Sequence, residues 1–541
     1  MSIANKVDAI FPDEANIPKE FLLEPHIHQV EYLIDGELRH WHGPMQEVIS
    51  PVCVRTSSGA VPKLIGRYPQ LTQKESVQAL SAAVNAYENG RGLWPTLSVG
   101  DRIAHIEEFT YRMGKQKKQV VNLLMWEVGK PFKDSEKEFD RTIAYVKDTV
   151  AALKDLDRVS SRFVIQEAII GQVRRAPLGV VLCMGPFNYP LNETFTTLIP
   201  SLIMGNTVIL KPPKHGMLLY HALLEAFQDS FPKGVVNTIY GKGREVLPPL
   251  MASGKIDVLA FIGTSGAANH LKKQHPKPHR LRSILGMEAK NAAIVLPDAN
   301  LDLTIKECVL GCLSFNGQRC TALKILFVHS NIVDPFLDRF IEAIKNLKYG
   351  MPWENDVFIT PLPEPRKPRY LSELVEDARR LGAQVINEGG GRTNNSFFYP
   401  AVLYPVSRKM RIYAEEQFGP VIPVISFDDI ETPVKYVVES DYGQQISIFG
   451  RDPDVIADLI DPLVNQVCRV NINSQCQRSP DTFPFTGRKD SAEGTLSVSD
   501  ALRVFSIRTL VAAQEIDLNK EIITTIVRQR KSNFLSNDFI L

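Results

Sequence analysis

Short apolar runs alternate with segments of helical character through the middle of the chain. From residue 179 the runs GVVLCMG, TVILKPP and VLAFIG are separated by MLLYHALLEAF and GREVLPPLMAS. Two further stretches repeat the rhythm, one with AAIVLP and ALKILFVH, the other with FYPAVLY and VIPVISF. Strands joined by helices in this way are typical of doubly wound parallel sheets, so the pattern predicts an α/β fold with such units.

The chain before residue 179 has a different pattern. Residues 1–46 are polar and interrupted by prolines, whereas 75–129 and 134–157 contain long stretches without helix breakers and predict helices. The stretch SRFVIQEAIIGQVRRAPLG alternates at period two, which predicts a hairpin within 158–178. Together with the strand-like LRVFSIRTLVA near the C-terminus, it predicts an exposed extension that pairs with another copy.

Length and charge set limits on this picture. The 541 residues correspond to three or four domains, at roughly 150 residues each. Hydrophobic residues make up 44% and charged residues 23%, which is typical of globular enzymes and argues against a disordered chain. The net charge of +1 argues against a nucleic-acid partner, and no apolar run is long enough to predict a membrane span.

The cysteines indicate the compartment. There are seven, at scattered spacings, without a CxxC pair or a metal-type cluster. The first residues show no basic segment followed by an apolar one. We therefore expect a reduced, cytoplasmic protein without a metal site, in which most cysteines are small buried hydrophobes.

Cys320 in FNGQRCTALK is the candidate nucleophile. It lies between a predicted helix and a predicted strand, Gly317 permits an unusual backbone there, and Arg319 places a positive charge beside the thiol. A neighbouring cation favours the thiolate, which is the reactive form. Taken alone, a single cysteine is more often an inert buried residue, so Cys320 needs support from other segments.

Asn188 in GPFNYP is the candidate donor to a developing oxyanion. It follows the first apolar run at a turn enforced by Gly185, Pro186 and Pro190, where a side-chain amide can face a reacting oxygen. The alternative is an ordinary turn asparagine, because asparagine is common in turns.

Two further strand ends are candidates for nucleotide binding. Lys211 and Lys214 follow TVIL, and ligands of open α/β sheets bind at the carboxyl ends of strands. Two lysines there could hold a ribose or a 2′-phosphate, and the lack of a nearby carboxylate favours NADP over NAD. Gly263 and Thr264 in FIGTSG open a helix whose N-terminal amides could meet a pyrophosphate. There is no GxGxxG, and a lone strand-end lysine is usually only a solvated charge.

Six segments together resemble the aldehyde dehydrogenase superfamily. They are GPFNYP, MGNTVILKPPK, FIGTSG, GQRC, EEQFGPV and FPFTGRKDS, in the family's order. Each is weak alone, but six in order at plausible spacing are specific. The resemblance covers about residues 32–513 and implies two doubly wound domains, one for the cofactor and one for catalysis, plus a small β extension that makes oligomers.

The resemblance also implies residue roles. It implies that Cys320 is the nucleophile and that the Asn188 amide and the Cys320 backbone N–H form the oxyanion hole. It implies that Lys211 contacts the adenosine ribose and that Glu416 and Phe418 contact the nicotinamide riboside. The full set of residues assigned to the cofactor is Pro186, Phe187, Lys211, Lys214, Gly263, Thr264, Glu416 and Phe418.

A narrower resemblance concerns the substrate. An arginine directly before the nucleophile is similar to the non-phosphorylating, NADP-dependent glyceraldehyde-3-phosphate dehydrogenases, which hold the substrate phosphate with arginines and a tyrosine. The matching residues are Arg141, Tyr189, Arg319 and Arg478. Several guanidinium groups can bind a phosphate of charge near −2 bidentately, although each arginine singly could be a solvated surface residue.

One motif departs from the family pattern Glu-Leu-Gly-Gly-Lys, in which the Glu is the general base. Here the segment reads LGMEAK, and aligning on Lys290 puts Gly286 at the base position. Glu288 lies two residues further on, and in an extended strand it would point to the same side as residue 286. We therefore take Glu288 as the candidate base in a shifted position. A smaller departure is Ala492, where the family usually has glycine.

The expected activity is oxidation of D-glyceraldehyde 3-phosphate to 3-phosphoglycerate with NADP, through a cysteine thioester that water hydrolyses. The alternatives are a dehydrogenase for another, anionic aldehyde, and a catalytically impaired family member with a binding role. Besides this small-molecule substrate, the partner we expect is a second copy of the chain, in a homodimer or homotetramer.

The expected domain division follows the resemblance. Its parts are an N-terminal extension at 1–31, a NAD(P)-binding domain at 32–157 and 179–285, a catalytic domain at 286–492, an oligomerisation extension at 158–178 and 493–513, and a C-terminal tail at 514–541.

Overall fold

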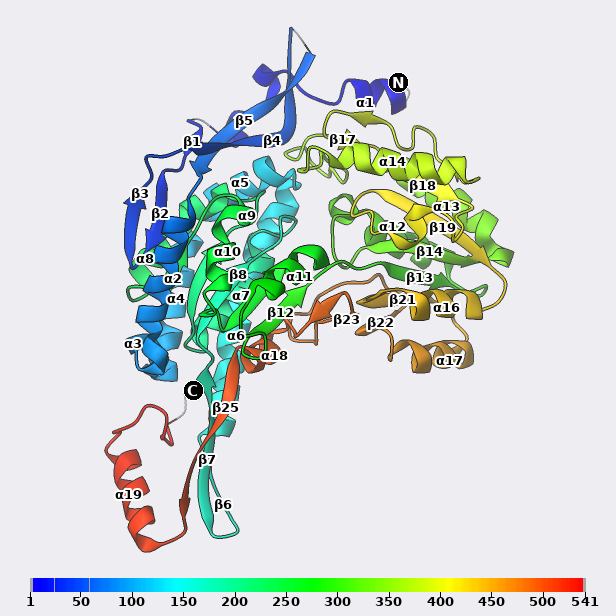
Figure 1. Ribbon diagram of the computed structural model, residues 1–541. Helices are drawn as coiled ribbons and strands as arrows, with labels where there is room; N and C mark the ends of the chain where they lie inside the picture. The colour runs from blue at the N-terminus through cyan, green and yellow to red at the C-terminus, as the bar shows by residue number, and fades with distance from the viewer. Residues whose placement is uncertain (1–2, 24, 58, 539–541) are drawn as a thin grey trace.

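The computed structural model describes residues 3–23, 25–57 and 59–538. Two large parallel sheets with helices around them form the body of the molecule, and a long three-stranded sheet projects from it (Figure 1). The prediction of an α/β fold with two doubly wound sheets is thereby confirmed. The expected terminal parts include residues 1–2, 24 and 539–541, which lie outside the described residues.

The first sheet has six strands, of which five are parallel. In spatial order they are β10 (Val236–Thr238), β9 (Thr207–Lys211), β8 (Val180–Met184), β11 (Val258–Ile262), β12 (Arg282–Gly286) and the antiparallel β24 (Ala492–Glu493). Helices α2 (Gln73–Tyr87) and α7 (Asn192–Ile203) pack against β8 and β9. Every residue of β8 is buried, which explains why this strand appears in the sequence as a continuous apolar run.

The second sheet has seven strands and forms the other half of the body. In spatial order they are the antiparallel β15 (Gln384–Val385), then β18 (Ala401–Tyr404), β19 (Val421–Phe427), β14 (Leu323–His329), β13 (Asn291–Val295), β21 (Gln445–Phe449) and β22 (Arg469–Ile472). Its helices include α12 (Leu301–Leu313), α13 (Val333–Lys345) and α14 (Lys367–Arg380). Only residues 287–290 separate β12 of the first sheet from β13 of the second, so this short segment crosses between the two halves.

The predicted helices before residue 160 are present. They are α2, α4 (Val99–Lys115), α5 (Lys117–Val128) and α6 (Phe132–Ser160). The long hairpin of β4 (Met45–Thr56) and β5 (Gly59–Pro69) was not predicted, because two register shifts interrupt its alternation. The first helix, α1 (Ile3–Asp8), lies against the second half of the body, where Asp8 pairs with Arg392 at 2.7 Å.

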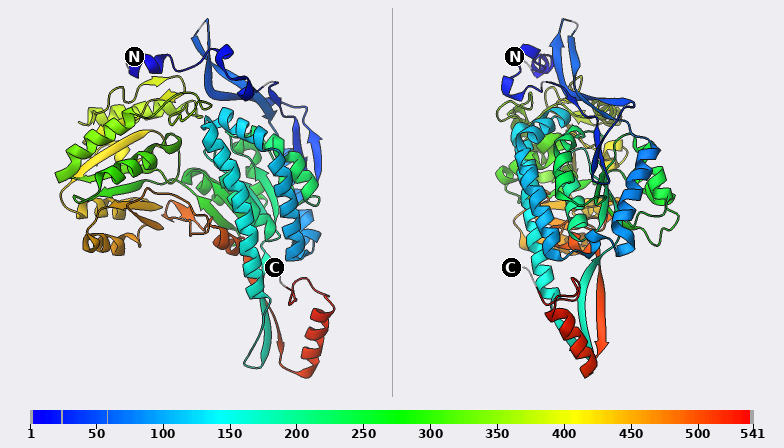
Figure 2. Two further views of the ribbon diagram at one scale, coloured as in Figure 1. Left: turned by 180° about the vertical axis from the view of Figure 1, so that it is seen from behind. Right: turned by 90° about the vertical axis from the view of Figure 1, so that its left-hand side faces the viewer.

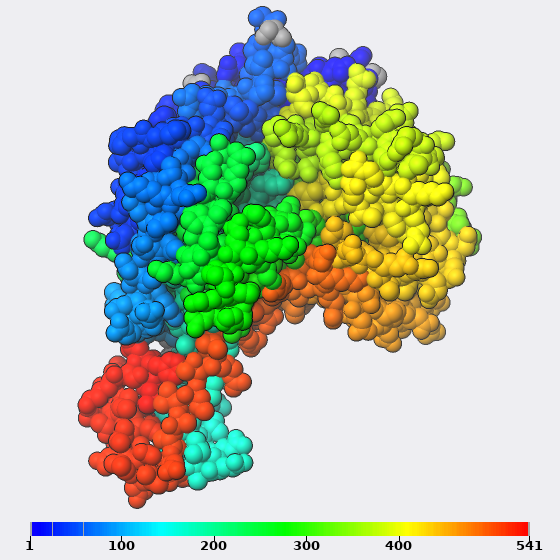
Figure 3. Space-filling model, in the orientation of Figure 1, coloured from blue at the N-terminus to red at the C-terminus, as the bar shows by residue number. Residues whose placement is uncertain are grey.

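The projecting sheet contains the predicted hairpin. It consists of β6 (Phe163–Gln166), β7 (Ile169–Pro177) and β25 (Ser506–Gln514), all antiparallel, and it extends below the body as a separate lobe (Figures 2 and 3). Residues 502–504, predicted as strand, belong instead to α18 (Val498–Val504). A further helix, α19 (Asp517–Arg528), follows β25 in the C-terminal tail.

The helices of the described residues differ from membrane spans in length and composition. Across residues 3–23, 25–57 and 59–538, none combines the length and the apolar character needed to cross a membrane.

Candidate active site

Cys320 lies in the loop that leads from α12 to β14. Three consecutive residues before it, Phe315, Asn316 and Gly317, have left-handed backbones, with φ of 48°, 57° and 69°. A Cβ on Gly317 would lie 2.6 Å from the carbonyl oxygen of Cys312. The expectation that Gly317 permits an unusual backbone is confirmed, since no larger residue fits this approach.

Two side chains fix the backbone of Cys320. The Asn291 amide donates to the Cys320 carbonyl oxygen at 2.8 Å, and the Lys324 ammonium donates to the same oxygen at 3.1 Å. Lys324 in turn forms a buried ion pair with Glu416. The nucleophile loop is therefore anchored to β13, β14 and the Glu416 loop together.

The thiol is less acidic than the sequence predicted. Burial raises the pKa of Cys320, and the Glu193 carboxylate raises it further, while Lys324 and Arg478 lower it. The Arg319 Nη2 donates to the carbonyl oxygens of Leu310 and Gly311 at 3.0 Å each, so the guanidinium is hydrogen-bonded to the end of α12. The expectation that this neighbouring cation favours the thiolate stays a prediction.

Asn188 lies beside the nucleophile loop. It is in the turn between β8 and α7, is 5% exposed, and its amide Nδ2 donates to the Gln318 carbonyl oxygen at 2.8 Å. Because Gln318 is two residues before Cys320, this bond joins the predicted oxyanion donor to the predicted nucleophile segment. An amide that also has a second N–H can face a reacting oxygen at this place.

A buried ion pair fixes the backbone of the turn that contains Asn188. Lys130 pairs with Glu138, and its ammonium also donates to the Asn188 carbonyl oxygen at 2.8 Å. The Glu138 carboxylate accepts from the backbone N–H groups of Leu191 and Asn192, both at 3.1 Å. All five residues are fully or almost fully buried, so the turn is held in position.

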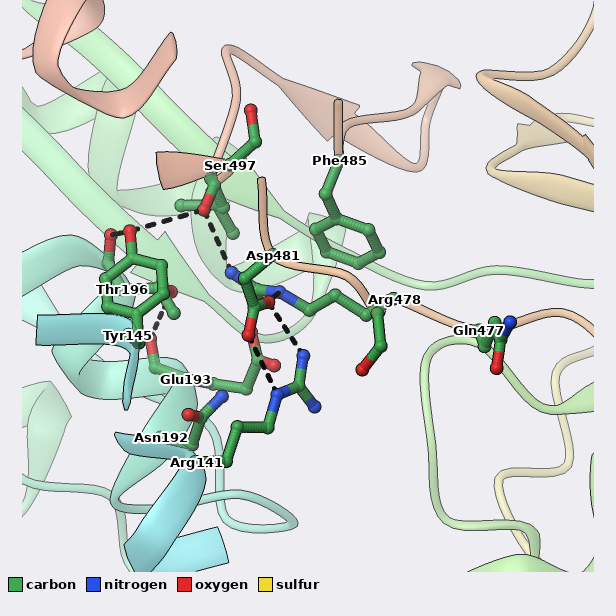
Figure 4. Close-up of polar contacts among 12 residues, drawn as sticks. Arg141, Tyr145, Asn192, Glu193, Thr196, Gln477, Arg478, Asp481, Phe485 and Ser497 are labelled. Atoms are coloured by element: carbon green, nitrogen blue, oxygen red, sulfur yellow. Dashed lines mark hydrogen bonds and ion pairs between the residues drawn. The ribbon is translucent and has the colours of Figure 1, made fainter. Parts of the chain in front are cut away.

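Arg141 and Arg478 meet in one cluster of charges (Figure 4). Arg141 donates to both carboxylate oxygens of Asp481, at 2.9 and 2.7 Å, and Arg478 donates to Asp481 at 3.0 Å. Arg478 also forms an ion pair with Glu193, at the start of α7. Burial opposes the charge of Asp481, but the hydrogen bond from Arg141 and the charge of Arg478 outweigh it and lower its pKa.

Tyr189 connects this cluster to the nucleophile loop. Burial raises the pKa of its phenol, while the charges of Arg319 and Arg141 oppose the rise. The Lys130 ammonium lies 3.7 Å from the centre of the ring. The structure thus brings the four residues Arg141, Tyr189, Arg319 and Arg478 into one region around Cys320.

Several buried polar atoms of this region have no hydrogen-bond partner among the described residues. They are Asn192 Nδ2, Arg319 Nε and both polar atoms of the Gln318 side chain. Unpaired buried polar groups cost free energy, so a water or a ligand at this place would find donors and acceptors ready to bind it.

Glu288 lies in the segment that crosses between the two sheets. Its carboxylate accepts from the backbone N–H of Ser265, at 2.8 Å, at the start of α11 (Ser265–Gln274). Together with burial, Glu416 and Glu288 raise the pKa of Tyr442 to about 12, so both carboxylates are near that phenol. The expectation that residues 286 and 288 share one strand face is wrong, because β12 ends at Gly286.

The nucleotide candidates lie at strand ends of the first sheet, as expected for ligand binding. Lys211 ends β9, and burial without a carboxylate partner lowers its pKa to about 8. Lys214 is exposed nearby. Thr264 caps α11 through a hydrogen bond from Ala267 N, and Gly263 donates to the carbonyl of Gly286 at 2.9 Å.

The remaining cofactor candidates form a second group near the nucleophile loop. Pro186 and Phe187 lie in the turn that carries Asn188, and the Phe187 ring packs edge-on against Phe418, with centroids 5.8 Å apart. Glu416 accepts from Ala289 N at 3.1 Å in addition to its ion pair with Lys324. The crossing segment contacts both groups, because Glu288 accepts from Ser265 N and its neighbour Ala289 donates to Glu416.

These residues fit a dinucleotide, with one adjustment. A partly buried lysine without a counter-ion and the N-terminus of a helix both suit phosphate groups. Glu288 already occupies the Ser265 N–H, and it must leave if a pyrophosphate binds there. No group of His, Cys, Asp or Glu in the described ranges is suited to hold a metal ion.

The sequence did not point to several residues that complete the site. Glu193 and Asp481 pair with the arginines, and Lys324 and Asn291 anchor the Cys320 carbonyl. Asp481 is three residues after Arg478, a spacing that could have suggested the pair. Glu193 gave no such signal, because its partner is 285 residues away.

Comparison with known proteins gives a consistent result. The family model described as the aldehyde dehydrogenase family matches residues 52–510. A protein of Streptococcus equinus named NADP-dependent glyceraldehyde-3-phosphate dehydrogenase is 31% identical over 447 residues, which cover 82% of this chain and 91% of that protein. A lactaldehyde dehydrogenase of Methanococcus aeolicus is 26% identical, with coverage of 83% and 95%.

A solved structure shares the fold. It is the NADP-dependent glyceraldehyde-3-phosphate dehydrogenase of Bacillus halodurans C-125, complexed with NADP. The TM-score is 0.81 at 29% identity, with 90% of this chain and all of that chain covered.

Proposed function

Because this chain belongs to the aldehyde dehydrogenase family, we propose that it oxidises D-glyceraldehyde 3-phosphate to 3-phosphoglycerate with NADP. The observation that carries the proposal is the arrangement of Cys320, Asn188 and the Arg141–Arg478 cluster in one region. The name of the Streptococcus equinus relative supports the substrate and the cofactor, and so does that of the Bacillus halodurans enzyme.

In the proposed reaction these site residues act one after another. The Cys320 thiolate attacks the aldehyde carbon, and the carbonyl oxygen becomes an oxyanion that accepts hydrogen bonds from the Asn188 amide and a backbone N–H. Bound NADP supplies the acceptor for the hydride that leaves this carbon. The carbon is then a thioester, oxidised by two electrons, and a water hydrolyses it to the carboxylate and the free thiol.

The test is an assay of the purified protein with D-glyceraldehyde 3-phosphate and NADP, without inorganic phosphate. We expect NADPH and 3-phosphoglycerate in equal amounts. Absence of both, in protein that binds NADP, would overturn the proposed substrate.

The base that activates the water is part of the proposal. We assign it to Glu288, which a bound pyrophosphate would displace from the Ser265 N–H and so free to turn towards the Cys320 loop. The position that the resemblance gives to the base is Gly286, which has no side chain to act.

The preference for NADP over NAD rests on Lys211. Its low pKa reflects burial without an anion, so a 2′-phosphate would provide the missing counter-charge. Lys214 lies nearby and exposed, where it could contribute less because water screens it.

We expect Lys211→Met to weaken NADP binding by roughly 10- to 100-fold, the usual value of a charged hydrogen bond, and NAD binding much less. In the wild type the affinity for NADP should fall as the pH rises through about 8, where the Lys211 ammonium loses its proton. Fluorescence titrations of both cofactors from acid to alkaline pH measure this, with Lys214→Met as the control. Equal losses for NAD and NADP would show that Lys211 contacts only the ribose.

A separate observation supports a second candidate function. Carboxylates already neutralise Arg141 and Arg478, and this favours an aldehyde with less negative charge than a phosphate. Comparing glyceraldehyde 3-phosphate with unphosphorylated aldehydes, lactaldehyde among them, separates the two. A catalytically impaired enzyme with a binding role would bind NADP and form the thioester without turnover. This outcome would follow if Glu288, displaced from the family's base position, did not activate water.

We also propose that the chain associates with copies of itself through the projecting sheet, as a homodimer or homotetramer. The sheet carries exposed apolar residues on β6, on β25 and at the end of α6: Val159, Val164, Ile165, Ile507 and Leu510. Beside them lies a cavity of about 950 Å³. Exposed apolar surfaces of this kind mark protein interfaces.

Leu510→Glu is expected to shift the protein to a smaller species, since it places a charge in the proposed interface. Sedimentation velocity measures the mass. Val77→Glu is the control, because Val77 is an exposed apolar residue on α2, away from the sheet. An unchanged mass for Leu510→Glu would contradict the assignment of the interface.

The proposed location is the cytoplasm. All seven cysteines are free thiols, which suits a reducing compartment. Fractionation of the source cells tests this, and recovery of the protein with disulfide bonds would contradict it.

A further inference from the structure

The Arg478 guanidinium has a protein acceptor at each of its three nitrogens. Nε donates to Asp481 at 3.0 Å, Nη1 donates to Glu193, and Nη2 donates to the Leu496 carbonyl at 2.9 Å. The Phe485 ring lies 4.5 Å from the guanidinium carbon. With only 4% of its side chain exposed, Arg478 is already bound by the protein where the phosphate is expected.

The two carboxylates of the cluster have different positions. Asp481 bridges both arginines and is three residues from Arg478, so it holds the two guanidinium groups beside each other. Glu193 is on a different element, in the first turn of α7, and its ion pair is with Arg478. Figure 4 shows Glu193 and Asp481 among the side chains of this cluster.

Glu193 also acts on the thiol. After burial, its carboxylate raises the pKa of Cys320, whereas the charge of its partner Arg478 lowers it. The neighbouring Asn192 amide Nδ2 is buried and has no acceptor within the described ranges. A ligand that binds the Arg478 guanidinium would therefore compete with Glu193, next to the unused Asn192 donor.

We propose that Glu193 competes with the phosphate of the substrate for Arg478, and thereby sets how strongly the pocket favours a dianionic aldehyde. The inference rests on the proposed function. Two guanidinium groups and two carboxylates leave the cluster formally neutral, and a phosphate beside Glu193 brings like charges together. Aldehyde, thioester and product all carry the phosphate, so the competition weakens them alike and acts on KM more than on kcat.

The test compares Glu193→Gln, which removes the charge at nearly constant shape, with Glu193→Asp, which keeps it. We expect Glu193→Gln to lower the KM for glyceraldehyde 3-phosphate at least about tenfold, with the KM for unphosphorylated glyceraldehyde within about twofold of the wild type. Glu193→Asp should stay closer to the wild type. Equal changes for both aldehydes would show a structural role and overturn the inference.

Binding of glycerol 3-phosphate, measured by calorimetry, separates this inference from the proposed substrate. It carries the phosphate but no aldehyde, so turnover is not needed. If Glu193→Gln binds it at least about tenfold more tightly than the wild type while neither oxidises glyceraldehyde 3-phosphate, the inference stands and the proposed substrate falls. If the variant binds it no more tightly than the wild type, the inference fails whatever the activity.

Two further measurements guard against a general effect of breaking a buried ion pair. Asp157→Asn breaks the comparably buried pair with Arg174 near the projecting sheet, and it should leave the ratio of the two KM values unchanged. Alkylation of Cys320 by iodoacetamide, followed by mass spectrometry, should have its pH midpoint at lower pH in Glu193→Gln, since the carboxylate raises the thiol pKa. An unmoved midpoint would show that Glu193 does not face the thiol.

Discussion

Replacing Cys320 by serine is expected to reduce aldehyde oxidation by roughly 10⁴-fold or more, because the step that forms the covalent bond has no other nucleophile. An alcohol in the same place stays protonated, and the buried site that already raises the pKa of the thiol is unfavourable to an alkoxide. NADPH formation, followed by absorbance, measures the loss.

In the wild type, the rate of aldehyde oxidation should depend on pH in the way that a thiolate nucleophile requires. Since burial and Glu193 raise the pKa of Cys320, the thiolate fraction is small at neutral pH, and the rate should increase as the pH rises. Cys468→Ser is the matched control, because Cys468 is the other cysteine with partial exposure. Similar activity in the Cys320 and Cys468 variants would remove Cys320 from the mechanism.

Glu288→Gln is expected to stop the reaction after the first hydride transfer. General-base catalysis contributes roughly 10²- to 10⁴-fold, so hydrolysis of the thioester should slow by that factor while acylation continues. The expected record is one equivalent of NADPH per subunit, followed by a slow phase, with the acyl group found on Cys320 by mass spectrometry.

Gly286→Glu, added to Glu288→Gln, should restore part of the turnover. A Cβ on Gly286 would have its closest neighbours at 3.4 Å, on the side chain of Ile262, which is ordinary contact, so the position can accept a side chain. Restored turnover would show that only the base was missing. If Glu288→Gln turns over like the wild type and only binds NADP more tightly, Glu288 is not the base. Its role would then be to accept the hydrogen bond from the first backbone N–H of α11.

Much of the fold could be predicted because its core strands are buried on both faces. Strands β8, β9 and β14 are nearly continuous apolar runs, and such runs stand out without knowledge of their partners. The hairpin of β4 and β5 could not be recognised, since register shifts break the alternation that marks a strand. The tail helix α19 was not predicted either, although Leu518, Ile522 and Ile526 recur at helical spacing along it, and none of its residues is buried.

For the site, the sequence pointed to residues but not to their partners. Asn188 and Cys320 stand in local motifs, and the structure joins their segments by a hydrogen bond to Gln318. Glu193 and Arg319 show the limit of this approach. The first pairs across the fold with Arg478, and the second turns towards the end of α12, so neither charge could be assigned from its neighbours in sequence.

The pairing of β25 with β7 has a consequence for how the protein can be made. Arg175 and Ser506, which are 331 residues apart, are joined by a hydrogen bond in this pair, and β24 closes the first sheet from almost as far along the chain. The first sheet therefore lacks its edge strand β24 until the ribosome has synthesised nearly the whole polypeptide. Contacts of such long range form slowly, so the nascent chain must keep its early strands from aggregating while it waits for the end that completes them.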